Sequence, residues 1–173
     1  EFTVNSTTAG VQDSPTLDVA RDGQLVISWQ GPDADGTGIF AQRYAADGSA
    51  AGSEIAVNTF TTGSQSDPTV EIDSDGNFLV AWTSENQDGD GDGVYAQRFN
   101  AAGWAQSNEF RLNDTTGGQQ RDVSLGLRDD GEVVATWISS GQDGDGWGIY
   151  STRRLQGRQH MTVVDTGVPI VAD

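Results

Sequence analysis

Short apolar runs recur along the chain at regular intervals. The most apolar of them span residues 25–29, 78–82 and 133–137, and each ends in tryptophan. They show no 3.6-residue period, so they indicate strands, and their near-continuous hydrophobicity predicts strands covered on both faces. The arginines that end the next strand, Arg43, Arg98 and Arg153, are spaced 55 residues apart. This regularity is typical of a repeat protein.

Each repeat has the same four segments. An alternating segment opens it, at residues 1–5, 54–58 and 109–113, and a second strand is expected at 15–19, 68–72 and 123–127. An Asp-Gly pair then predicts a tight hairpin turn into the apolar run. An acidic, glycine-rich loop follows, and the third long strand ends in arginine. We therefore expect a four-stranded antiparallel meander in every repeat.

These meanders predict an all-β fold. We expect one repeat domain over residues 1–167, with repeats at about 1–53, 54–108 and 109–167, and a tail or linker at 168–173. Residues 161–167 are predicted to close the third repeat. Four-stranded units of this length are typical of β-propeller blades, although propellers usually have four to eight blades. A homodimer closing a six-bladed ring, a fragment of a larger propeller, and a threefold β-trefoil or β-prism are the alternatives.

The repeated motifs also resemble a known group of sequences. The pattern Asp-Gly-x-Phe-x-Val-x-Trp followed by Gln-Asp-Gly-x-Gly-x-Gly-Val-Tyr-Ala-Gln-Arg-Phe is similar to tandem repeats of large bacterial secreted proteins associated with RTX motifs and type I export. The resemblance covers residues 1 to about 155. It implies a secreted or cell-surface, propeller-like module. The third repeat departs from the pattern at Val123 and at Ser151-Thr152, and the RTX nonapeptide itself is absent.

Charge narrows the choice of partners. The 173 residues contain 26 acidic and 9 basic side chains, giving a formal net charge of −17. Such a field disfavours nucleic acid and anionic membrane surfaces and favours cations. No apolar run is long enough to insert across a bilayer. The absence of cysteine excludes disulfides and thiolate sites.

The acidic loops are the predicted metal sites. Calcium binds six to eight oxygen ligands, and alternating Asp and Gly places carboxylates two residues apart on a chain that can curl around an ion. The closing glutamate of an EF-hand loop is missing, and Asp-Gly pairs also simply make turns. The candidate Ca²⁺ ligands are Asp88, Asp90 and Asp92 in the second loop, Asp33 and Asp35 in the first, and Asp143 and Asp145 in the third.

Aromatic and basic residues form two further sets. The repeated tryptophans are expected in the core, whereas Trp104, Trp147 and Phe60 do not recur and suit stacking against a sugar. Packing against a neighbouring sheet is an equal alternative for these three. Each repeated arginine is expected to bind a carboxylate of the neighbouring sheet, such as Asp18 or Glu71.

Catalysis has little support in the sequence. The acidic pairs recur once per repeat, whereas an active site is normally unique, so repetition favours binding or structure. The sequence therefore predicts a non-catalytic, calcium-stabilised binding and adhesion module of a secreted or surface protein, with an extracellular glycan as ligand. The alternatives are a structural spacer without a ligand and a fragment of a glycoside-acting enzyme that uses paired carboxylates.

Overall fold

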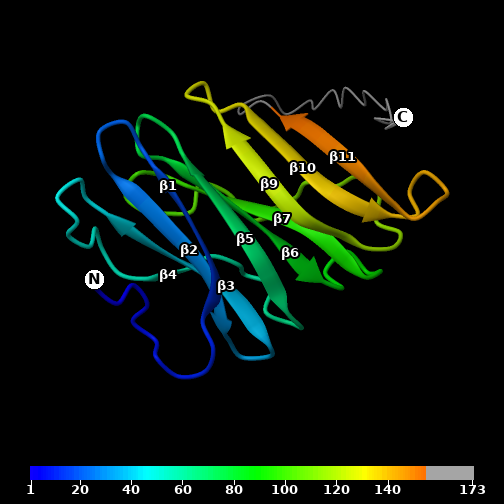
Figure 1. Cartoon of the computed structure of the whole chain (residues 1–173), viewed down its shortest axis with the longest axis horizontal. Coiled ribbons are helices and arrows are strands. Elements are labelled where there is room, and N and C mark those ends of the chain that lie inside the picture. The colour runs from blue at the N-terminus through cyan, green and yellow to red at the C-terminus, as the bar shows by residue number, and fades with distance from the viewer. Residues whose placement is uncertain (155–173) are drawn as a thin grey trace.

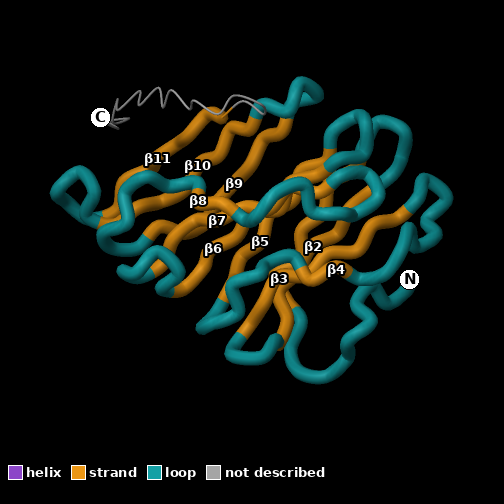
Figure 2. The backbone as a smooth tube through the Cα atoms, turned by 180° about the vertical axis from the view of Figure 1, so that it is seen from behind, coloured by secondary structure: helices purple, strands orange, loops and turns teal. Residues whose placement is uncertain are grey.

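The computed structural model describes residues 1–154, which form strands, turns and loops (Figures 1 and 2). The strands group into three sets, one per repeat. They are β1 (Asp13–Val19), β2 (Leu25–Pro32), β3 (Thr37–Tyr44) and β4 (Ile55–Ala56); β5 (Gln65–Ile72), β6 (Phe78–Glu85), β7 (Asp92–Phe99) and β8 (Phe110–Arg111); and β9 (Gln120–Leu127), β10 (Val133–Ser140) and β11 (Trp147–Arg154).

The three sheets are antiparallel meanders, as the sequence predicts. The first sheet has the order β1-β2-β3-β4, the second β5-β6-β7-β8, and the third contains β9, β10 and β11 among the described residues. Its expected closing strand at 161–167, and the tail at 168–173, lie outside the described residues. The strands β1, β5 and β9 lie side by side where the sheets meet and are called the inner strands below (Figure 1).

Two apolar cores hold the sheets together. Between the first and second sheets, Val26, Ile39 and Ala41 pack against Val70, Val80 and Trp82. Between the second and third sheets, Leu79, Ala81 and Val94 pack against Val123, Ala135 and Trp137. We call the face of a sheet that looks toward the preceding sheet its leading face, and the face that looks toward the following sheet its trailing face. In the second sheet Val70, Val80 and Trp82 belong to the leading face, and Leu79, Ala81 and Val94 to the trailing face.

Continuous burial on both faces occurs in the second sheet, whereas in β2 of the first sheet the buried Val26, Ser28 and Trp29 lie among half-buried residues. Residues 78–84 of β6 are all buried, as their hydrophobicity predicts. In β10 buried residues alternate with exposed or half-buried ones, because no described segment covers the trailing face of the third sheet. The prediction of double-sided burial is thus correct for β6 and wrong for β10.

The opening segments of the repeats differ from the prediction. Residues 1–5 form no strand, and β4 and β8 contain only two residues each. Val57 still donates its N–H to the carbonyl oxygen of Ile39 (2.8 Å), and the N–H of Ile39 then donates to the side chain of Asn58 instead of to the backbone. A side-chain amide thus replaces part of the backbone pairing expected from the alternation. No helix in the described part of the chain is long and apolar enough to cross a membrane.

Candidate functional site

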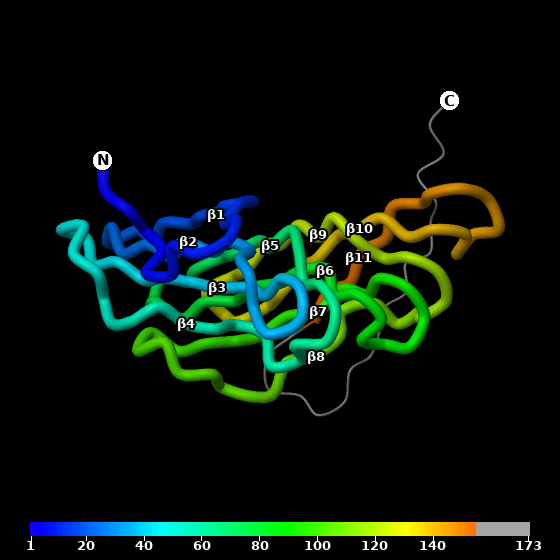
Figure 3. The backbone as a smooth tube through the Cα atoms, turned by 90° about the horizontal axis from the view of Figure 1, so that it is seen from below, coloured from blue at the N-terminus to red at the C-terminus, as the bar shows by residue number. Residues whose placement is uncertain are grey.

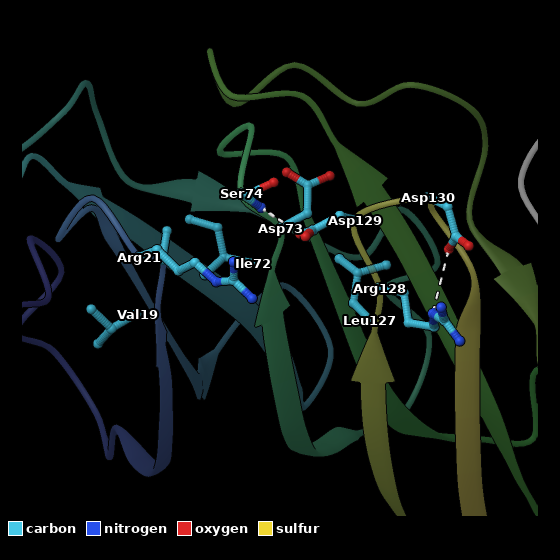
Figure 4. A pocket seen from close by; sticks show the side chains of 10 residues that line it. Val19, Arg21, Ile72, Asp73, Ser74, Leu127, Arg128, Asp129 and Asp130 are labelled. Atoms are coloured by element: carbon cyan, nitrogen blue, oxygen red, sulfur yellow. Dashed lines mark hydrogen bonds and ion pairs between the residues drawn. The ribbon is translucent and has the colours of Figure 1, made fainter.

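The hairpins that follow the inner strands border an open cavity of about 550 Å³, within the usual size range of ligand pockets. Each sheet contributes one wall: Val19 to Arg21 from the first, Ile72 to Ser74 from the second, and Leu127 to Asp130 from the third (Figure 4). The local cause is the Asp-Gly turn, since Gly23, Gly76 and Gly131 all have positive φ angles. The turns reverse the chain at the same level in all three sheets.

The cavity is lined by charges of both signs. Arg21 extends from the first sheet toward Ile72 of the second (Figure 4). The Asp129 carboxylate accepts a hydrogen bond from the main-chain N–H of Ser74 (3.1 Å). The Ser74 side chain, this main-chain bond and the nearby Arg21 lower the pKa of Asp129. Arg128 lies 3.8 Å from Asp130 and 3.4 Å from Glu132. Cationic donors and ionised acceptors thus surround one opening, an arrangement suited to a polar, hydroxyl-rich ligand.

Two carboxylates on adjacent inner strands stand next to this cavity. Asp18 immediately precedes Val19 on β1, and Glu71 immediately precedes Ile72 on β5. The main-chain N–H of Ile72 donates to Asp18 Oδ2 (2.9 Å), and that of Leu127 donates to Glu71. Each carboxylate therefore satisfies a donor on the edge of the next inner strand. The equivalent position on β9 is Gly126, so the series ends after two members.

The environment of Glu71 favours its protonated form. Burial of its side chain raises the pKa of Glu71, and the negative charge of Asp18 raises it further, against the lowering effect of the Leu127 N–H. A carboxyl group with a raised pKa next to a second carboxyl group is an arrangement suited to general acid–base chemistry. The raised pKa of Glu71 therefore places a carboxyl group that retains its proton to higher pH beside the carboxyl group of Asp18.

The other end of each inner strand has the same backbone irregularity in all three repeats. Ser14, Asp67 and Asp122 occupy equivalent places and have φ angles of 50°, 51° and 58°. The pairing register with the second strand shifts at these places in all three sheets. Each is a β-bulge, and each points an exposed polar side chain away from the ladder. Residues with positive φ other than glycine are uncommon, and the aligned repeats contain no sequence signal beyond the recurring polar residue.

The predicted metal ligands have structural partners. In all three acidic loops the first aspartate accepts a hydrogen bond from the main-chain N–H two residues on, which closes an Asx turn: Asp33 to Asp35, Asp88 to Asp90, and Asp143 to Asp145. Asp35 then accepts from Gly63 (3.5 Å) and Asp90 from Gly118 (3.3 Å), both in the connector of the next repeat. The loops thus join neighbouring repeats.

Asp92 departs from this pattern because it begins β7 opposite Glu85. Burial raises the pKa of Asp92, and Arg121 nearby opposes that rise. Within residues 1–154, no group of three or more acidic or histidine side chains has an arrangement that could hold a metal ion. Calcium binding by these loops stays a prediction.

The three candidate aromatic residues do not form one surface. Trp104 is 73% exposed in the turn after β7, at the hairpin end of its sheet. Phe60 is half-buried in the connector before β5, where its N–H donates to Glu109 Oε1 (3.3 Å). Trp147 begins β11 beside the third acidic loop, with the Arg121 guanidinium 4.5 Å from the centre of its ring. Phe60 and Trp147 therefore lie at the acidic-loop end and Trp104 at the opposite end.

The repeated arginines reach the neighbouring sheet but bind no carboxylate there. Arg43 donates to the carbonyl oxygen of Ala101, and Arg98 to that of Gly131 (3.1 Å). Each bonds a turn of the next sheet, where a carbonyl is left without a ladder partner. Arg153 has no following sheet in the described residues, and pairs with Glu132 of its own sheet (2.5 Å).

Comparison with known proteins supports the fold through structure. No family model and no curated protein matches the sequence. The structure of an endo-arabinase from Bacteroides thetaiotaomicron aligns with a TM-score of 0.64 at 17% identity, covering 99% of this chain and 67% of that one. A thermostable family-43 glycoside hydrolase aligns with a TM-score of 0.58 at 10% identity, and 94% of this chain covers 60% of it. The propeller-like, all-β prediction agrees with these likenesses.

The same comparison contradicts the prediction of a non-catalytic binding module. Both of these structural neighbours are enzymes that act on glycosides. The argument from repetition failed for a physical reason. Equivalent positions of the inner strands carry different residues, Asp18, Glu71 and Gly126, so a repeated scaffold still presents one asymmetric group of side chains.

Proposed function

We propose that this chain is part of a glycoside-acting enzyme built from propeller-like sheets, with Asp18 and Glu71 at the working site. The observation that carries the proposal is the pairing of these carboxylates beside a polar cavity of about 550 Å³. The fold likeness to an endo-arabinase and a glycoside hydrolase supports the substrate class. Because the chain spans 60% of the second of these proteins, the activity of the whole protein is part of the proposal.

The proposed chemistry follows from the raised pKa of Glu71 next to Asp18. Glycoside hydrolysis uses one carboxylic acid to protonate the leaving oxygen and one carboxylate to activate water or to attack the sugar. Glu71 is the general acid, because burial and the charge of Asp18 keep its proton. Asp18 is the carboxylate, held in place by the N–H groups of Val19 (2.8 Å) and Ile72 (2.9 Å).

The cavity walls position the substrate. The guanidinium groups of Arg21 and Arg128 donate hydrogen bonds to sugar hydroxyls, and the carboxylates of Asp73 and Asp129 accept them. These side chains come from all three sheets, so the site exists only when the sheets are stacked.

Several predictions from the sequence accompany this function as proposals. A fourth strand at the outer edge of the third sheet would make every sheet a complete propeller-like blade. The net charge of −17 and the repeat resemblance support a secreted or cell-surface location and an extracellular glycan as the partner. Calcium in the acidic loops adds stability; calorimetry with Ca²⁺ and melting with EDTA test this part separately.

The decisive experiment measures reducing ends released from arabinan and other plant and bacterial polysaccharides. We expect hydrolysis by the wild-type chain and a fall of about 10²–10⁴-fold in kcat for Glu71→Gln and Asp18→Asn. Asp47→Asn is the matched control, because Asp47 is an exposed carboxylate in the turn after β3 and asparagine keeps its acceptor oxygen.

Two outcomes would overturn the proposal. If the wild-type chain releases no sugar from any glycan, the enzymatic function is wrong. If Asp67→Asn abolishes turnover while Glu71→Gln retains it, the working site lies at the bulges rather than at the cavity.

A further inference from the structure

The third sheet lacks, within the described residues, the short outer strand that completes the other two. In the first sheet Ile55 pairs with Ala41, and in the second Phe110 pairs with Ala96. The equivalent residue of β11 is Ser151, whose outer edge has no strand partner among residues 1–154. The outer segments read Glu-Ile-Ala-Val-Asn and Glu-Phe-Arg-Leu-Asn, and residues 1–5 read Glu-Phe-Thr-Val-Asn. Residues 1–5 therefore carry the motif of the outer strands but form no strand in the described structure.

A buried asparagine ends each outer segment and fixes it in place. Asn58 Oδ1 accepts the main-chain N–H of Ile39 (2.7 Å), while its Nδ2 donates to Phe60 O (2.8 Å) and Gln65 Oε1 (3.0 Å). Asn113 repeats the three bonds with Val94, Thr115 and Gln120. One side chain thus links the third strand of one sheet to the first strand of the next.

Asn5 already makes two of these three bonds. Its Nδ2 donates to Thr7 O (2.6 Å) and to Gln12 Oε1 (3.3 Å), the counterparts of the connector and glutamine partners of Asn58. Its Oδ1 is the atom that, in the other repeats, accepts from the third strand of the preceding sheet. The matching donor in the third sheet is the N–H of Ile149, which occupies the position of Ile39 and Val94.

Residues 1–6 are also seated on the first sheet as their counterparts are seated on the second. Glu54 accepts the N–H of Ser6 (2.7 Å), just as Glu109 accepts the N–H of Thr59 (2.6 Å). The Phe2 ring lies 5.4 Å from that of Tyr44, and the equivalent Ile55 packs on the core that contains Phe99. Residues 1–6 therefore lie on the first sheet in the position from which their counterparts pair with the preceding sheet.

The open faces of the end sheets match in the same way. On the leading face of the first sheet, Leu17 and Val19 are exposed, and their equivalents Val70 and Ile72 pack on the preceding sheet. On the trailing face of the third sheet, Ile149 is 74% exposed and Val134 is 38% exposed. Their equivalents, Val94 and Leu79, are fully buried against the following sheet. The chain thus carries both halves of the interface that it uses internally.

We propose that a second copy of this chain supplies residues 1–5 as the outer strand of the third sheet and packs its first sheet on that sheet. Asn5 Oδ1 of one copy accepts the N–H of Ile149 of the other. Residues 1–5 cannot pair with β11 of their own chain, because the N-terminus lies at the opposite end of the molecule from β11 (Figure 3). Residues 161–167 contain neither the glutamate nor the asparagine of the motif, so they match it less well. Two such contacts would close six sheets into a ring, within the usual propeller range.

Disulfide trapping tests the register of this contact. By analogy with the Ile55–Ala41 pair, Phe2 should face Ser151 of the other copy. The chain has no cysteine of its own, so Phe2→Cys and Ser151→Cys can be made as separate single variants. We expect a cross-linked heterodimer when the two are mixed and oxidised, and little dimer from either alone. Phe2→Cys mixed with Ala46→Cys, an exposed position in the turn after β3, is the control.

Mass in solution provides the second measurement. By light scattering we expect a concentration-dependent dimer or head-to-tail oligomer for the wild type, weakened at least tenfold by Asn5→Ala or Ile149→Asp. Trp104→Asp, which changes an equally exposed apolar residue in a turn, should leave the mass unchanged. A monomer at all concentrations would overturn the proposal. A disulfide within one molecule of a chain that carries both Phe2→Cys and Ser151→Cys would also overturn it.

Discussion

The second sheet and the third sheet are built from nearly the same sequence pattern, but they are stabilised differently. Leu79 and Val134 occupy equivalent positions, yet Leu79 is fully buried and Val134 is 38% exposed. Arg98 bonds a turn of the next sheet, whereas its equivalent Arg153 pairs within its own sheet. Burial in this chain therefore depends on having a neighbour on each side. The repeat pattern alone does not decide it.

Core truncation should show this difference most strongly. Leu79→Ala removes a side chain that lies in the core between the second and third sheets, and we expect it to lower the free energy of unfolding by about 2–5 kcal/mol. Val26→Ala and Val134→Ala form a matched pair at the equivalent position, and the second should cost less than about 0.5 kcal/mol. Urea titration followed by tryptophan fluorescence measures all three. Equal losses for Val26→Ala and Val134→Ala would show that the trailing face of the third sheet is covered.

The buried asparagines give the next largest effect. Asn113→Ala leaves the N–H of Val94 without its acceptor and the side-chain oxygen of Gln120 without its Asn113 donor. It should lower the free energy of unfolding by about 1–3 kcal/mol. Asn5→Ala at low protein concentration should cost less, because Asn5 is only half-buried whereas Asn113 is buried. Thermal melts of both variants check this, and a similar Tm loss would contradict the contrast.

The effect of removing the repeated arginine should depend on pH in the third sheet but not in the second. Arg98→Ala loses an inter-sheet hydrogen bond to a carbonyl and should cost about 1 kcal/mol at any pH between 3 and 8. Arg153 lowers the pKa of Glu132, so its contribution is present above the ordinary glutamate pKa and is lost as the pH falls through the lowered value. Arg153→Ala should therefore destabilise the protein at pH 7 and have little effect at pH 3. Denaturant midpoints at the two pH values distinguish the variants.

The smallest expected effect concerns Glu71. Its pKa is raised in the folded state, so its ionisation opposes folding as the pH rises from the ordinary glutamate pKa to the raised one. Glu71→Gln should therefore raise Tm slightly at pH 7 and leave it unchanged near pH 3, while the proposed function predicts that it lowers kcat. A lower Tm at pH 7 would mean that the carboxylate is needed structurally, as the acceptor for Leu127.

The sequence predicts the long strands and their order well, for a simple reason. Apolar runs such as 78–82 and the Asp-Gly turns beside them are local signals, and local signals decide hairpins. The outer strands were predicted too long because the asparagine that ends each segment replaces ladder hydrogen bonds, and composition does not reveal that substitution.

The candidate site was the harder part to predict. Asp18 and Glu71 are separated by a whole repeat, and only the stacking of sheets brings them together. The acidic loops were predicted as metal sites because their carboxylates are close in sequence. In the structure those carboxylates close Asx turns and accept hydrogen bonds from the next connector. In a stacked repeat, residues at equivalent positions of successive inner strands are the ones to compare.

The stacking of the three sheets also has a consequence for how the protein opens. The extensive contacts between strands of different sheets join the first sheet to the second and the second to the third. Stability in such a chain is close to a sum of nearest-neighbour terms, as in a one-dimensional array. Amide hydrogens of β6 should then exchange with solvent most slowly, and those of β11 and β1 earlier, through local openings that leave the middle intact. Partial unfolding would therefore begin at the two ends of the stack.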